Sequence, residues 1–511
     1  MTEIEKLRSG SINYRLGFLL KDSLLYGGAT AISRMLYVFI IPFLARIFTK
    51  AEYGVVDGVT VLSLCFGLLI IFGQDAAVAR FFYETDDEGE RKQIVTNSFL
   101  IQLLLSTVVA AALYVNSASI CNLYFLSDDY AEVFQVMVLG LPFATAVQYF
   151  QNLLKWVFFR KQFIVMSIGF TFTFLILAIA FVTHFDMGIV GVFYAKLISS
   201  ALFTLVGIYY CKSFFALPKS LKYSGSLLSY GWPFMLIGVF GALMPSLDRF
   251  YITKHMGLEV MAVYAIGFRI SSLLKLPVAG FQTAWGPFAL AIYKDENSGD
   301  TYNKVLLFYS ILLVTIGLLV VVVTEPLIYV FASEKYMASA IVIIPLVFSI
   351  IIDSLSWITG IGISISKKTY NSSIGYGIGL IVTVAAILLL IEPYGVLGVA
   401  YGVLIGRIFL TLSLTILSRL VYPIAFDYMK PILVFIAGFL ISLALFSFGE
   451  FTWWQQMLIR AVAVGAFIGM VWFAILTSTQ KNELMKAVQK KLRKENVGDT
   501  KAKDESESSH D

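Results

Sequence analysis

The sequence predicts an all-α polytopic membrane protein of about fourteen transmembrane helices: two six-helix lobes and an extra C-terminal helix pair. Composition, a succession of apolar runs and an internal repeat predict this class. Of 511 residues, 59% are hydrophobic and 14% are charged, whereas a soluble domain carries about 25% charged residues. This composition excludes a soluble enzyme.

The apolar runs are long enough to cross a bilayer, which takes about 20 residues per helix. They are continuous instead of alternating at period two, which favours helices over a β-barrel. The first run is too long, and with Arg34 too basic in its middle, for a cleaved signal peptide. The fourteen predicted spans are 24–48, 53–82, 94–115, 131–159, 163–182, 188–211, 227–251, 260–292, 305–323, 341–365, 372–391, 396–420, 432–448 and 457–476.

Lysine and arginine are divided unequally between the two sets of loops. One set, together with the termini, holds 25 of them, and the opposite set holds only Lys50, Lys254 and Lys335. Basic loops stay in the cytoplasm, so both termini are predicted to be cytoplasmic. The predicted parts are a cytoplasmic segment (1–22), a first lobe (23–216), a second lobe (217–422), an extra span pair (423–477) and a basic, disordered cytoplasmic tail (478–511).

An internal repeat relates the two lobes. The run 24–46 recurs loosely at 227–249, and both copies end in Pro-x-Leu-x-Arg, at Arg46 and Arg249. GIVGVFYAKLI (188–198) returns as GVLGVAYGVLI (395–405), identical at six of eleven positions. Each half holds an even number of spans, so the halves are parallel repeats about an axis normal to the membrane. This arrangement predicts a cavity between two lobes that rock to open on alternate sides.

Charges deep within spans are the candidate binding residues. A charge at this depth is costly, so it should face a partner or a watery cavity. Five deep basic residues against one acidic residue, Asp353, would attract an anion, and arginine matches phosphate oxygens in a bidentate fashion. The alternative is an internal ion pair of Asp353 with Arg407 or with Lys275. The five candidate cations are Arg34, Lys196, Arg269, Lys275 and Arg407.

Further charges lie near span ends. Asp75 and Arg80 in GQDAAVAR could form a lobe-gating or interfacial ion pair, could serve ion coupling, or could act on the substrate. Asp353 in mid-span is a further candidate for gating or ion coupling. For Arg46 and Arg249 we expect the side chains to extend to the lipid headgroups. Among the aromatic residues, Tyr37, Tyr194 and Trp357 could offer stacking faces to sugars.

No motif indicates catalysis. The cysteines Cys65, Cys121 and Cys211 have no CxxC spacing. The sequence has no Walker lysine motif, HExxH or GxSxG, so we expect no enzyme activity, no metal and no cofactor. The glycines of GYGIGL (375–380) predict close helix packing instead of phosphate binding.

Three stretches carry a family resemblance. Residues 24–56, GQDAAVARFFYE (73–84) and 229–252 resemble the polysaccharide (O-antigen type) flippases of the multidrug/oligosaccharidyl-lipid/polysaccharide exporter superfamily. The resemblance runs through about 20–420. It implies alternating-access export of an oligosaccharide linked to undecaprenyl diphosphate. Its implied partners are this lipid-linked oligosaccharide, membrane lipids, a polymerase and a chain-length regulator, with no nucleic acid. The terminal span pair departs from the commoner twelve-span form, and also occurs among peptidoglycan lipid-precursor flippases.

Other functions stay open. A peptidoglycan lipid-precursor flippase or an exporter of cationic drugs would share the architecture. The drug exporter would need an unpaired carboxylate deep in the first lobe, where the sequence instead places Arg34 and Lys196, with Asp75 near the cytoplasmic face. A membrane-embedded polymerase or ligase would need a large external loop, and none is predicted.

Overall fold

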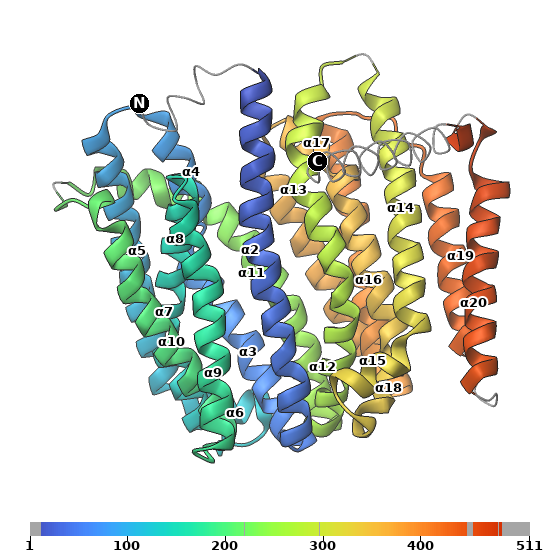
Figure 1. The fold of residues 1–511 in the computed structure, drawn as a ribbon, viewed down its shortest axis with the longest axis horizontal. Helices are drawn as coiled ribbons and strands as arrows, with labels where there is room; N and C mark the ends of the chain where they lie inside the picture. The colour runs from blue at the N-terminus through green and yellow to red at the C-terminus, as the bar shows by residue number, and fades with distance from the viewer. Residues whose placement is uncertain (1–11, 219, 296, 447–452, 479, 483–511) are drawn as a thin grey trace, which may run out of the picture. The chain divides into compact units, whose positions relative to one another are not determined.

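The computed structural model describes residues 12–218, 220–295, 297–446, 453–478 and 480–482, and every regular element in these ranges is helical (Figure 1). This confirms the predicted all-α class. The chain divides into two compact units, described separately. Unit 1 comprises 1–302 and 323–426, and unit 2 comprises 303–322 and 427–511.

Unit 1 contains the predicted first lobe and the predicted second lobe except for residues 303–322. The first lobe consists of α2 (Ile12–Ile47), α3 (Lys50–Ile71), α4 (Gln74–Glu84), α5 (Glu88–Val115), α6 (Ser117–Phe125), α7 (Ala131–Trp156), α8 (Arg160–Ile164), α9 (Phe170–Thr183) and α10 (Gly188–Cys211). A π-helical turn at Val165–Gly169 joins α8 to α9. The second lobe consists of α11 (Lys222–Met256), α12 (Leu258–Ser271), α13 (Lys275–Ile292), α15 (Thr324–Phe331), α16 (Ala340–Thr359), α17 (Ile361–Ile365) and α18 (Tyr370–Val421).

Unit 2 contains most of α14 (Ser298–Val322), together with α19 (Met429–Phe446) and α20 (Trp453–Met470). The sequence assigns the α14 span to the second lobe, but the structure groups it with the C-terminal helix pair. Within unit 2, Arg460 donates from Nη1 to the Val322 carbonyl at 3.0 Å, joining α20 to α14.

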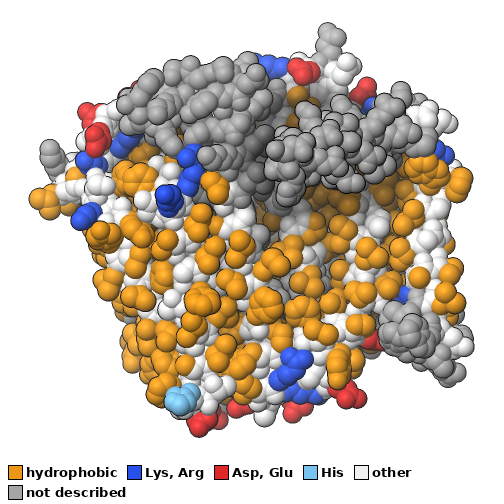
Figure 2. All heavy atoms as spheres, viewed as in Figure 1, with side chains coloured by type: hydrophobic (Ala, Val, Ile, Leu, Met, Phe, Trp, Pro, Cys, Tyr) orange, Lys and Arg blue, Asp and Glu red, His pale blue; other side chains and the backbone are white. Residues whose placement is uncertain are grey.

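Twelve helices among the described residues are long and apolar enough to cross a membrane. They correspond in position to the predicted spans, and α19 corresponds to a further span just below that length. Hydrophobic side chains cover the middle of the face shown in Figure 2, and charged side chains gather toward its two ends. The total of fourteen spans and the repeat stay predictions.

Helix α18 holds two predicted spans. At Gly395 the backbone has φ 58° and ψ −137°, a conformation that only glycine adopts readily, and the chain reverses there. A Cβ on Gly379 would touch Leu410, and one on Gly402 would touch Ile387. The two arms of α18 therefore pack closely side by side, as the glycine run at 375–380 predicts.

Local sequence signals fix the start and end of α3. Thr49 and Glu52 form a capping box at its first turn, with the Thr49 amide donating to the Glu52 carboxylate at 2.8 Å. At its other end Phe72 and Gly73 both have positive φ, 50° and 66°. The predicted span 53–82 is consequently broken into α3 and α4.

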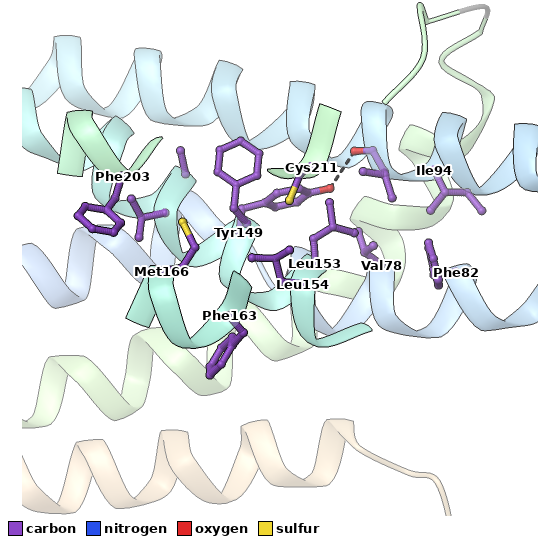
Figure 3. Packing of buried hydrophobic residues seen from close by; sticks show 14 of the residues in the cluster. Val78, Phe82, Ile94, Tyr149, Leu153, Leu154, Phe163, Met166, Phe203 and Cys211 are labelled. Atoms are coloured by element: carbon purple, nitrogen blue, oxygen red, sulfur yellow. Dashed lines mark hydrogen bonds between the residues drawn. The ribbon is translucent and has the colours of Figure 1, made fainter. Parts of the chain in front are cut away.

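The first lobe has a dense core of aliphatic and aromatic side chains (Figure 3). Tyr149, Leu153 and Leu154 of α7 pack with residues of α4, α5, α9 and α10. The Tyr149 hydroxyl donates to the Val95 carbonyl at 2.8 Å, so the one polar tip in this part of the core has a partner. Ala29 of α2 packs against this core, as does Leu227 of α11 from the second lobe.

Candidate functional site

A cavity of about 680 Å³ lies between the two lobes of unit 1. The first lobe supplies its wall from α2, α3 and α9, and the second lobe from α12 to α13 and from α15. Most of the lining is apolar. Its polar side chains are Thr30, Ser33, Tyr37, Thr171, Arg269, Ser272 and Lys275.

Two of the five predicted cations, Arg269 and Lys275, line this cavity. Arg269 lies eleven residues into α12, which is about 16 Å from the start of the helix at 1.5 Å per residue. Its side chain is 18% exposed. Lys275 begins α13, is exposed, and has its Nζ 5.1 Å from the centre of the Phe268 ring. The cavity thus has positive side chains on one wall, that of the second lobe.

Arg269 also has a partner in the first lobe. Its Nε and Nη2 donate to Oδ1 of Asp57 on α3, at 3.2 and 2.9 Å. The other carboxylate oxygen, Oδ2, accepts from Nε of Arg249 on α11 at 2.6 Å. Asp57 is therefore divided between two arginines of the second lobe.

Arg249 completes the group, which we call the Asp57 cluster: Asp57, Asp248, Arg249 and Arg269. Nη1 of Arg249 donates to Oδ1 of Asp248 at 3.2 Å and to the Pro245 carbonyl at 2.9 Å. Oδ2 of Asp248 accepts from the Tyr264 hydroxyl at 2.6 Å. Asp57, Asp248 and Arg249 are each 1–2% exposed. Buried charges persist only when they are paired in this way.

The cluster corrects two expectations. Extension of the Arg249 side chain to headgroups is wrong, because the side chain is buried and its guanidinium is hydrogen-bonded. The ratio of five deep cations to one carboxylate is also wrong, because Asp57 and Asp248 are buried within predicted spans. The sequence does place Asp57 inside the span 53–82 and Asp248 inside the span 227–251. Both lie near span ends, where a charge is usually expected to reach water.

The remaining predicted cations lie elsewhere. Lys196 on α10 is half-buried and donates to the Ser63 hydroxyl at 3.3 Å, toward α3. Arg407 on α18 pairs with Asp353 on α16 through a 3.1 Å contact, which is the internal ion pair that the sequence left open. Neither residue is among those lining the cavity. Arg34 lies on α2, and its side chain is outside the described residues.

The lobes also meet at the end of unit 1 where α2 ends and α3 begins, here called the Lys50 end. Arg46 donates from Nη2 to the Val330 carbonyl of α15 at 2.8 Å. Lys335 donates to the Phe48 carbonyl at 2.6 Å. Arg46 is exposed, and its guanidinium is also hydrogen-bonded to the second lobe. With the Asp57 cluster, these contacts close this end.

The opposite end, where α5 begins, is here called the Lys92 end. A Cβ on Gly73 would collide with the backbone of Gly231 on α11, so the two backbones touch. Glu90 accepts a hydrogen bond from the Tyr223 hydroxyl. Close backbone packing and a hydrogen bond from a neutral hydroxyl therefore contribute to the closure here.

Asp75 and Arg80 flank this contact without pairing with each other. Asp75 accepts from the Ala76 amide at 2.9 Å, within the first turn of α4. Arg80 pairs with Glu84 at 2.9 Å and lies 4.7 Å from the centre of the Tyr230 ring on α11. The ion pair considered for the two residues does not form, while Arg80 does contact the second lobe.

One of the three candidate aromatic residues lines the cavity. Tyr37 stacks on Phe174 with ring centres 5.7 Å apart and 16° between the planes. Tyr194 and Trp357 are not among the lining residues. Tyr37 is therefore the aromatic face that a sugar ring in the cavity could meet.

Solved structures of similar fold include three transporters. The chain superposes on "Lipid II flippase MurJ, inward closed conformation" with a TM-score of 0.70 and 16% identity, covering 88% of this chain and 99% of that one. It superposes on a multidrug resistance MATE family transporter of the MOP superfamily, in an inward-facing conformation, with a TM-score of 0.61 and 16% identity, covering 76% and 98%. A Vibrio cholerae MATE transporter superposes with a TM-score of 0.55 and 16% identity, covering 78% of this chain and 95% of that one. These likenesses establish the fold.

Sequence comparison gives the family. No curated protein matches the chain. A family model described as "Polysaccharide biosynthesis protein" matches residues 43–341, more than half of the chain, and spans the α3 and α11–α12 segments that form the Asp57 cluster. The chain, with the fold of the exporter superfamily that its sequence resembles, belongs to this family of polysaccharide biosynthesis proteins.

Proposed function

We propose that the protein is a flippase that exports an undecaprenyl-diphosphate-linked oligosaccharide across the bacterial inner membrane by alternating access. Membership of a polysaccharide biosynthesis family and an exporter-type fold support a flippase or exporter. The finer statement, the identity of the cargo, rests on the cavity.

One observation carries the proposal: helices of both lobes line a mostly apolar, partly open cavity with Arg269 and Lys275 on one wall. A lipid-linked sugar brings an apolar tail and a diphosphate to the same place. An arginine fork can replace part of the water around the phosphate oxygens, and its low-dielectric surroundings strengthen the attraction. Tyr37 offers a ring to the sugar. A cationic drug would meet unfavourable charge on that wall.

Reconstituted liposomes test the cargo. We expect the wild type to flip a fluorescent undecaprenyl-diphosphate oligosaccharide, measured by quenching with a membrane-impermeant reductant. The Arg269→Gln, Lys275→Gln variant should flip about 100-fold more slowly, because each charge-assisted hydrogen bond is worth about 1.5–3 kcal/mol.

The matched control is Lys161→Gln, Lys294→Gln, which removes two charges from exposed positions and should flip at the wild-type rate. Flipping of the peptidoglycan lipid precursor in place of the oligosaccharide lipid would favour the alternative flippase. Wild-type flipping by the cavity variant would contradict a cationic binding site.

Reporter fusions test the orientation. We expect fusions at Lys219 and Lys481 to score cytoplasmic and fusions at Ser127 and Glu392 to score external, since the basic loops stay inside. Lys219 itself lies outside the described residues. An external score at Lys219 would refute the six-plus-six topology.

A further inference from the structure

The Asp57 carboxylate is the one acidic group of its cluster that crosses between the lobes. It leaves α3 of the first lobe and accepts from Arg249 of α11 through Oδ2 and from Arg269 of α12 through Oδ1. Asp248, in contrast, bonds only to residues of the second lobe, Arg249 and Tyr264. The same buried cluster therefore contains one carboxylate between lobes and one within a lobe.

Arg269 is shared between this cluster and the cavity. Its Nε–Nη2 edge is on Asp57, while its side chain lines the cavity wall. This two-donor edge is the geometry that binds a carboxylate or a phosphate. Asp57 occupies the edge that a bound phosphate would take.

The charges of the cluster cancel. Two carboxylates, Asp57 and Asp248, face two guanidinium groups, Arg249 and Arg269. While Asp57 holds Arg269, the cluster adds no net charge to the attraction that Lys275 exerts on an anion in the cavity. The anion gains the full attraction of Arg269 only when the Asp57 contact is broken.

We infer that Asp57 is a built-in competitor of the cargo: it takes the place of a phosphate on Arg269, so that anion binding in the cavity and closure of the Lys50 end exclude each other. Asp57 is thus a positioning residue that sets the affinity for the anion. The inference rests on the proposed anionic cargo.

The competition couples cargo to movement. A ligand shifts a conformational equilibrium only by its difference in affinity for the two states. An anion that needs the Nε–Nη2 edge of Arg269 favours the state in which the Lys50 end is open, and by reciprocity an open Lys50 end favours the anion. The empty protein stays closed because Asp57 supplies the missing negative charge.

A matched pair of variants tests the inference, with inorganic pyrophosphate as the probe and the full-length detergent-purified protein. Asp57→Asn and Asp248→Asn each remove one negative charge from the same buried cluster, but only Asp57→Asn releases Arg269. We expect pyrophosphate to bind Asp57→Asn about tenfold more tightly than the wild type. Asp248→Asn should stay within about twofold, and adding Arg269→Gln should abolish the gain.

Spin labels measure the closure. The labels are attached at Asp128→Cys in the first lobe and Glu259→Cys in the second, because both positions are exposed. The three native cysteines are buried and can be replaced by alanine. We expect the distance between the labels to lengthen when pyrophosphate is added to the wild type. It should already be long in Asp57→Asn without the anion, and unchanged in Asp248→Asn.

The outcomes separate the inference from the proposed function. If the wild type flips the diphosphate lipid and binds pyrophosphate but Asp57→Asn shows neither tighter binding nor a longer distance, the inference alone is overturned. An equal gain in Asp248→Asn also overturns it, since net charge would then suffice. A wild type that neither binds pyrophosphate nor flips the lipid overturns both. If Asp57→Asn does not fold, Asp57→Asn with Arg249→Gln keeps the cluster neutral while releasing Arg269, and the same increases are required.

Discussion

We expect replacement of Arg249 with alanine to destabilise the protein by about 3–5 kcal/mol, the cost of breaking a buried ion pair from one side. Arg249 is 1% exposed and contacts both Asp57 and Asp248. Its loss leaves Asp57 with Arg269 alone and Asp248 with the Tyr264 hydroxyl. We expect a marked fall in the unfolding temperature. It can be measured by size-exclusion chromatography of detergent-purified protein that has been heated to a series of temperatures.

Arg46→Ala is the control for this prediction, because Arg46 is the repeat-related residue but is exposed. It should lower stability far less. Combining Arg249→Met with Asp57→Asn and Asp248→Asn should recover most of the loss, since no unpaired charge is then buried. An unfolding temperature of Arg249→Ala equal to that of the wild type would contradict the buried cluster.

Arg407→Ala abolishes export with protein level and membrane insertion retained, and the same loss is expected for Arg34→Ala. Arg407 and Asp353 are both partly exposed, at 18% and 32% of their side chains, so their pair can exchange with a ligand. Lysine at position 407 should restore part of the activity, because it keeps the charge but loses the planar fork. Surface display of the polymer in cells, with the membrane protein level measured by immunoblot, checks the result.

The second variant separates a binding role from a structural one. If Asp353→Asn restores export to Arg407→Ala, the defect comes from an uncompensated carboxylate and the pair is structural. If export stays lost, Arg407 acts on the cargo. Normal display with an apolar residue of similar size at position 407 would contradict a role of the Arg407 charge in export.

The helices were predictable because hydropathy is local. Each apolar run of about 20 residues reports its own span, and the glycines at 375–380 report the close packing found within α18. The division of α14 from the second lobe was not predictable, since grouping depends on contacts between distant segments.

The pairing of charges was predictable only in part. The sequence predicts that Asp353 pairs with Arg407 or with Lys275, because Asp353 lies in the middle of a span where a lone charge is costly. The structure shows the pair with Arg407. Asp57 and Arg249 are 192 positions apart, and both lie near span ends, where hydropathy alone allows a charge to reach water. Even the repeat misled here, since Arg46 and Arg249 occupy matching positions but one is exposed and the other buried.

The backbone contact between Gly73 and Gly231 closes the Lys92 end by steric fit. At the Lys50 end the closing contacts include the ion pairs of Asp57. A contact made by steric fit responds to volume: one methyl group at Gly231 would push α11 away from the backbone at Phe72 and Gly73, with no change in charge. A contact made by ion pairs responds to charge: an amide at position 57 would weaken the pairs with the two arginines, with almost no change in volume. We therefore expect two conservative substitutions of different kinds to open the protein at its two opposite ends.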